Sequence, residues 1–109
     1  MSDTRVLLVD DEEDLRVSTA QALELHGLQV ETFSSADDVL ARVGPGFAGV
    51  VVSDIRMSGM DGMTLLQRVR EIDHDIPVIL ITGHGDVQLA VKAMREGAYD
   101  FIEKPFATP

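Results

Sequence analysis

Acidic side chains stand at the ends of two strongly apolar runs of the sequence. Asp10 and Asp11 follow the run at residues 6–9, and Asp54 follows the run at residues 50–52 after one serine. Carboxylates that are brought together repel one another, and a divalent cation relieves that repulsion. Mg²⁺ suits such a place, because it binds through a few carboxylates, retained water and a phosphate oxygen. The pattern predicts Mg²⁺ chemistry, with Asp11 and Asp54 as direct ligands and Asp10 acting through water.

Asp54 is also the candidate nucleophile, since a carboxylate can attack phosphorus and form an acyl phosphate. Thr82 follows the apolar run at residues 78–81, and Lys104 follows the strand-like segment at residues 99–103. With the cation, they could share the charge on the oxygens of a transferred phosphoryl group. Each residue has a simpler interpretation by itself, because acidic pairs and threonines often cap helices and a lysine before proline is commonly a solvated charge. Their joint placement at the ends of four predicted strands favours chemistry over accident.

The positions of these residues depend on an alternation of short apolar runs with amphipathic windows. We expect strands at residues 5–9, 29–33, 49–53, 77–81 and 99–103, and helices at residues 14–26, 36–43, 63–72 and 86–96. Such an alternation is typical of a parallel sheet with helices on both faces. It predicts a flavodoxin-like, doubly wound α/β domain with five strands in the order 2-1-3-4-5. In that order strands one and three are neighbours, so the three carboxylates should converge.

Composition narrows the range of functions. The 109 residues carry a formal charge of −10, which repels phosphate backbones and argues against direct nucleic acid binding by this chain. Cysteine is absent, so thiolate chemistry is excluded. No apolar run is long enough to span a membrane. We expect a cytoplasmic protein.

Five motifs resemble the receiver domain of bacterial two-component response regulators, over residues 6–106. They are Leu7-Leu8-Val9-Asp10-Asp11, Val52-Ser53-Asp54-Ile55-Arg56-Met57, Met60-Asp61-Gly62, Ile81-Thr82-Gly83-His84-Gly85 and Lys104-Pro105-Phe106. The resemblance implies that Asp54 accepts a phosphoryl group from a sensor histidine kinase. It implies that Asp10 and Asp11 form an acid pocket and that the backbone carbonyl of Arg56 completes the Mg²⁺ site. It also implies that Lys104 contacts the phosphoryl group and is joined to Pro105 by a cis peptide bond.

The same resemblance implies a switch. Thr82 would move toward the phosphoryl oxygens, and Phe101 would turn inward into the vacated space. This would repack the surface made by the helix at residues 86–96 and the fifth strand. Ordinary core packing explains Phe101 equally well from sequence alone. A domain of this kind assists its own phosphorylation and dephosphorylation, and we do not class it as an enzyme.

Residues 82–86 and 97–106 resemble more particularly the receivers of enhancer-binding transcription activators, the dicarboxylate-transport regulators among them. Those activators carry an AAA+ ATPase and a helix-turn-helix module after the receiver and work with the sigma-54 polymerase. We therefore expect residues 1–109 to be an N-terminal fragment, with output domains beyond Pro109 and the final receiver helix missing. A homodimer is a further expectation, although the missing helix contributes to the dimer surface in this family.

Ser58 is a departure from the family pattern, because many receivers have proline at this position. The substitution removes no functional group, and we expect it to leave the loop after Asp54 somewhat freer.

Other classes of protein share parts of this pattern. A haloacid-dehalogenase-type phosphatase also uses an aspartate nucleophile, Mg²⁺ and a lysine, but its nucleophile follows the first strand in an Asp-x-Asp-x-Thr/Val motif. Residues 10–14 read Asp-Asp-Glu-Glu-Asp and lack the hydroxyl or valine. A pure interaction module with a dead site is disfavoured, because every group needed for phosphoryl transfer is present. A nucleotide- or flavin-binding protein is disfavoured because no glycine-rich loop follows the first strand.

Overall fold

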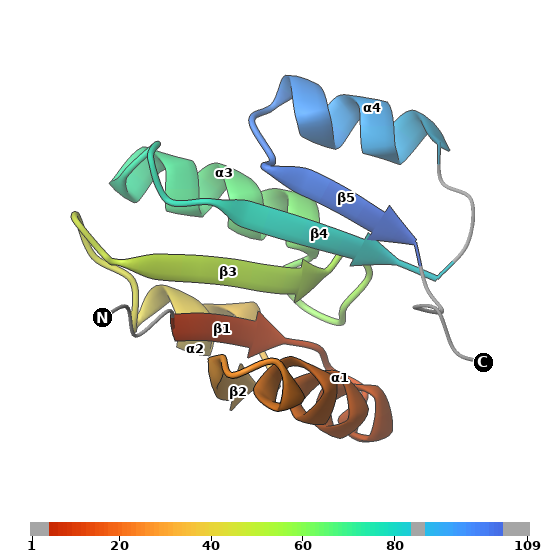
Figure 1. Ribbon diagram of the computed structural model, residues 1–109. Coiled ribbons are helices and arrows are strands. Elements are labelled where there is room, and N and C mark those ends of the chain that lie inside the picture. The colour runs from red at the N-terminus through yellow and green to blue at the C-terminus, as the bar shows by residue number, and fades with distance from the viewer. Residues whose placement is uncertain (1–4, 84–86, 104–109) are drawn as a thin grey trace.

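The computed structural model describes residues 5–83 and 87–103. Five parallel strands form one sheet in the order β2-β1-β3-β4-β5 (Figure 1). The strands are β1 (Arg5–Val9), β2 (Gln29–Phe33), β3 (Gly49–Asp54), β4 (Val78–Thr82) and β5 (Asp100–Glu103). The helices are α1 (Glu13–Leu25), α2 (Ala36–Leu40), α3 (Gly62–Ile72) and α4 (Val87–Arg95). The predicted doubly wound, flavodoxin-like fold and its strand order are confirmed.

Alternate residues of each central strand pack on opposite faces of the sheet. Leu7 and Val9 of β1 belong to the larger core, which α2, α3 and α4 cover. Val6 and Leu8 belong to a smaller core with Ala20 of α1. Among the described elements, α1 therefore covers one face and the other three helices cover the opposite face (Figure 1). Burial on both faces explains why the strands read as continuous apolar runs.

The helices begin and end at residues whose chemistry suits those positions. Asp61 caps α3, because its Oδ1 accepts a hydrogen bond from Thr64 N at 2.9 Å. Gly27 follows α1 with a φ of 85°, a conformation that most side chains disfavour, and it suits the end of the helix. The helix predicted through Val43 was too long: α2 ends at Leu40, and Val43 is buried in the turns that follow. Within the described ranges, no helix is long and apolar enough to cross a bilayer.

Strands β3 and β4 each extend one residue further than predicted. Asp54 and Thr82 are the last residues of these strands. The parallel ladder includes the pair Asp54–Ile81, and the next amide, Ile55 N, still donates to Ile81 O at 2.8 Å. The sheet therefore fixes the backbone of Asp54 directly.

Candidate functional site

Asp10 and Asp54 lie next to each other at the carboxyl edge of the sheet. Val9 is the register partner of Ser53, so Asp10 stands level with Asp54 on the adjacent strand. Neighbouring strands are about 5 Å apart. Asp10 is buried and Asp54 is half-buried. Two of the three carboxylates singled out in the sequence therefore share one edge, because β1 and β3 are neighbours.

Each of these two carboxylates accepts a hydrogen bond from the amide two residues further along. Asp10 Oδ1 accepts from Glu12 N at 2.9 Å, and Asp54 Oδ1 accepts from Arg56 N at 3.2 Å. Aspartate side chains commonly stabilise a sharp bend in this way. Arg16 of α1 donates to the Asp10 carbonyl at 2.9 Å, which holds the first helix against the bend. These hydrogen bonds therefore fix the direction in which the chain leaves β1 and the direction in which it leaves β3.

Asp11 reaches across to the loop between β3 and α3. Its Oδ2 accepts hydrogen bonds from Ser58 N at 2.9 Å and from Ser58 Oγ at 3.1 Å. Among the described residues, no group of three or more His, Cys, Asp or Glu side chains is placed to hold a metal ion. The predicted Mg²⁺ ligand set of Asp10, Asp11 and Asp54 stays a prediction, and in this structure Asp11 is hydrogen-bonded to Ser58. The expectation of a freer loop did not include this contact, which ties Ser58 to the loop after β1.

The donor atoms at this edge are nevertheless of the kind that Mg²⁺ binds. Asp10 and Asp54 supply carboxylate oxygens, and Arg56 supplies a backbone carbonyl close to them in sequence. Oxygen ligands are those that this hard cation prefers. Asp10 is only 6% exposed, and two neighbouring carboxylates repel less when a cation joins them. The donor set fits the ion, and Asp11 lines the cavity beside it.

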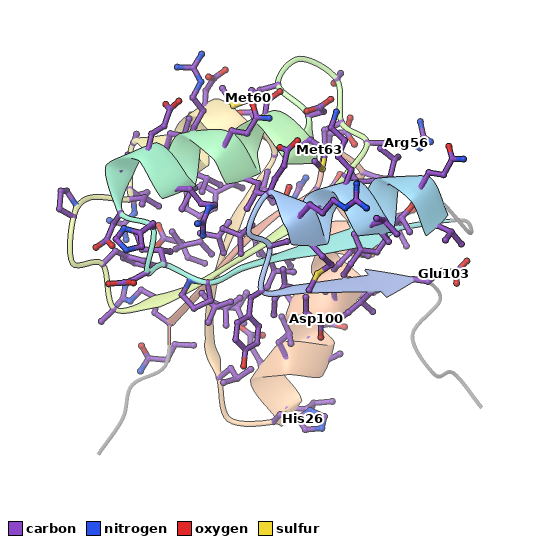
Figure 2. The ribbon with its side chains drawn as sticks, turned by 90° about the horizontal axis from the view of Figure 1, so that it is seen from above. His26, Arg56, Met60, Met63, Asp100 and Glu103 are labelled. Atoms are coloured by element: carbon purple, nitrogen blue, oxygen red, sulfur yellow. The ribbon has the colours of Figure 1, made fainter. Side chains whose placement is uncertain are left out.

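A cavity of about 520 Å³ opens beside these residues. Its lining includes Asp11, Arg56, Ser58, Asp61, Met63 and Leu89. Figure 2 shows Arg56 toward the same end of the molecule as Glu103, the last residue of β5. The cavity therefore lies at the carboxyl end of the strands, where open α/β sheets bind their ligands.

The motif Met60-Asp61-Gly62 brings the start of α3 against the backbone of Asp54. Gly62 N donates to the Ile55 carbonyl at 3.0 Å. A Cβ atom at Gly62 would lie 2.6 Å from the Asp54 carbonyl oxygen and 2.7 Å from Ile55 Cα. This position therefore requires glycine. Sequence reasoning assigned Gly62 no such role, although an Asp-Gly pair before an amphipathic window signals a capped helix start.

The remaining predicted residues are on β4, on β5 and beyond them. Thr82 is 1% exposed and follows Ile81, the register partner of Asp54. Phe101 is half-buried and packs against the larger core, so in this structure it has a core-packing role. Lys104 and Pro105, with the predicted cis bond between them, lie outside the described residues.

A five-stranded parallel sheet in this order, with acidic residues at two neighbouring strand ends, fits a receiver-type α/β domain. The family model described as "Response regulator receiver domain" matches residues 6–109, and the chain belongs to this family.

The most similar relatives include a transcriptional regulator from two bacteria. The C4-dicarboxylate transport transcriptional regulatory protein DctD is 54% identical over 102 residues in Rhizobium meliloti (strain 1021). Its counterpart in Pseudomonas aeruginosa is 58% identical over 103 residues. Each alignment covers 94% of this chain and 22% of the relative. The chain thus spans about a fifth of the length of these relatives.

Solved receiver structures have the same fold. The crystal structure of FixJ-N has a TM-score of 0.87 and 47% identity, and the match covers 98% of this chain and 86% of that chain. The solution structure of the beryllofluoride-activated NtrC4 receiver domain dimer has a TM-score of 0.83 and 39% identity. That match covers 94% of this chain and 85% of the other.

Proposed function

We propose that this receiver is a phosphorylation switch in which Asp54 accepts a phosphoryl group from a sensor histidine kinase. The register that sets Asp10 beside Asp54 in a member of the receiver family carries the proposal. The ladder to β4 and the close approach of Gly62 hold the Asp54 backbone. Its half-buried carboxylate stands at the edge that ligands reach.

In the proposed step, one oxygen of the Asp54 carboxylate attacks phosphorus and forms a new P–O bond. The bond between phosphorus and the donor breaks, which is a P–N bond in phosphohistidine and a P–O bond in acetyl phosphate. The electron pair of that bond leaves with the imidazole or with acetate, and the product is an acyl phosphate. The donor is consumed and the chain is modified, so we propose an acceptor and not an enzyme with turnover.

The proposed Mg²⁺ ligands are the carboxylates of Asp11 and Asp54 and the carbonyl of Arg56, with Asp10 acting through water. When bound, the ion neutralises charge on the phosphoryl oxygens. Thr82 and Lys104 are the proposed contacts of the chain itself to those oxygens.

The proposed output is a change in the surface formed by α4 and β5. Thr82 and Phe101 would transmit it to further domains, an AAA+ ATPase and a helix-turn-helix module, for sigma-54-dependent activation of transcription. The likeness to DctD, named as a transcriptional regulatory protein, supports this role. The dimer of the NtrC4 receiver supports association of two copies as one form of the active state.

The test is the intact mass of the chain after incubation with acetyl phosphate and Mg²⁺. We expect the mass of one phosphoryl group to be added to the wild type and not to Asp54→Asn. Omission of Mg²⁺ should abolish labelling. Asp37→Asn, a carboxylate removed from the exposed first turn of α2, is the matched control and should label normally. Equal labelling of wild type and Asp54→Asn would refute the proposal.

A further inference from the structure

We propose that Ser58 is a positioning residue that holds Asp11 away from the cation site and must release it when Mg²⁺ binds. This inference rests on the proposed function, because it assigns the Mg²⁺ site to the same edge of the sheet. It concerns a residue to which the proposed function gives no ligand role.

The contact between Ser58 and Asp11 is specific. One carboxylate oxygen accepts two hydrogen bonds from a single residue, one from its amide and one from its hydroxyl. The partners are 47 residues apart in sequence, so the contact joins the loop after β1 to the loop after β3. Two donors on one oxygen orient a carboxylate and offset part of its charge. Asp11 is therefore held toward the loop and is a weaker ligand there.

The loop around Ser58 is fixed at its ends independently of this contact. Ile55 N donates to Ile81 O at 2.8 Å, and Gly62 N donates to Ile55 O at 3.0 Å. Ser58 lies between these points and is exposed, and its hydrogen bonds to Asp11 tie down the middle of the loop. Release of Asp11 therefore removes the contact at the middle of the loop, while the hydrogen bonds at both ends and the one from Arg56 N to Asp54 Oδ1 stay in place.

The absence of a three-ligand group among the described residues agrees with this role. A cation that recruits Asp11 has to compete with the two Ser58 donors, and that competition lowers its affinity. A proline at position 58 has neither an amide hydrogen nor a hydroxyl, so it could not hold Asp11 in this way.

The experiment measures the dissociation constant for Mg²⁺ by isothermal titration calorimetry in a graded series of variants. Ser58→Ala keeps the amide donor only, and Ser58→Pro keeps neither. We expect binding about threefold tighter in Ser58→Ala and about tenfold tighter in Ser58→Pro, from the usual strength of one and two hydrogen bonds. Ser58→Thr keeps both donors and should restore wild-type affinity. Ser35→Ala, which removes a hydroxyl at the start of α2, should also bind as the wild type does.

A second measurement follows the contact itself. In wild type, the amide resonance of Ser58 should shift during the Mg²⁺ titration with the same midpoint as the calorimetric signal. Asp11→Asn, which removes the charge that the cation recruits, should reduce that shift. A Ser58 amide that does not respond to Mg²⁺ would contradict the release of Asp11.

The outcomes separate this inference from the proposed function. Unchanged or weaker Mg²⁺ binding in Ser58→Ala, with normal labelling of Asp54, overturns the role of Ser58 alone. The expected order of affinities without labelling of Asp54 supports Ser58 and overturns the phosphoacceptor. Absence of Mg²⁺ binding in every variant overturns both.

Discussion

Thr82 and Phe101 share one face of the sheet and are two positions apart in register. Leu80 of β4 is the register partner of Phe101 of β5, and Thr82 is two residues beyond Leu80 on the same strand. Side chains two residues apart on a strand point to the same face. Phe101 also borders a cavity of about 540 Å³ next to Met94 of α4. Thr82 and Phe101 therefore lie on the same side of two adjacent strands.

We predict that loss of the Thr82 hydroxyl separates phosphorylation from its effect on Phe101. In Thr82→Ala, Asp54 should still be labelled by acetyl phosphate, but the NMR shift of the Phe101 ring on phosphorylation should fall to less than half. The reason is that the hydroxyl would no longer be drawn to the phosphoryl oxygens. Thr82→Ser keeps the hydroxyl and should retain the shift. An undiminished Phe101 shift in Thr82→Ala would show that Thr82 does not transmit the change.

Gly62→Ala should destabilise the fold and disturb Asp54. The added Cβ would meet two backbone atoms within 2.7 Å, the Asp54 carbonyl oxygen and Ile55 Cα. Because backbone cannot move aside as a flexible side chain can, we expect a loss of about 1–3 kcal/mol in the free energy of unfolding, as for other overpacked sites. Urea denaturation measures this loss, and the rate of labelling by acetyl phosphate should fall with it.

The matched control for this substitution is Gly44→Ala. An added Cβ at Gly44 has no atom within 4 Å, so the variant should retain the stability of the wild type within about 0.5 kcal/mol. Equal stabilities of Gly62→Ala and Gly44→Ala would mean that the contact of α3 with the Asp54 backbone is not tight.

Asp73 should make the stability depend on pH in the acid range. Its carboxylate accepts hydrogen bonds from Gly46 N at 2.8 Å and Asp75 N at 3.0 Å. These bonds, chiefly the one from Gly46, lower the pKa of Asp73 below its ordinary value. A carboxyl group whose pKa is lower in the folded state stabilises the fold above its unfolded pKa of about 3.9, and this contribution is lost as the pH falls through the folded pKa.

Asp73→Asn should therefore be less stable than the wild type at neutral pH, and the difference should shrink as the pH falls below about 4. Thermal denaturation across this range provides the comparison. Glu71→Gln, an exposed carboxylate neutralised on α3, controls for the change in net charge. A gap between wild type and Asp73→Asn that stays constant with pH would contradict the assignment.

The order of elements could be predicted because the buried strands are apolar on both faces. The strands at residues 5–9 and 29–33 were predicted with their observed bounds. The first is covered on both faces and is a nearly continuous apolar run, whereas the second lies at the edge of the sheet and alternates polar with apolar residues. The ends of β3 and β4 were each one residue short, because Asp54 and Thr82 are polar but stay in the ladder. The ladder hydrogen bonds that hold them come from neighbouring strands and leave no local signal.

The sequence alone determined which chemical groups the edge of the sheet would carry, because residue type and position after a strand are local properties. Only the tertiary structure decided how those groups pair. The register of β1 and β3 sets Asp10 level with Asp54. The fold also brings Ser58 within hydrogen-bond distance of Asp11, although the two residues are 47 positions apart in sequence. Such pairings depend on strand register and loop direction, which result from packing of the whole domain and not from any segment by itself.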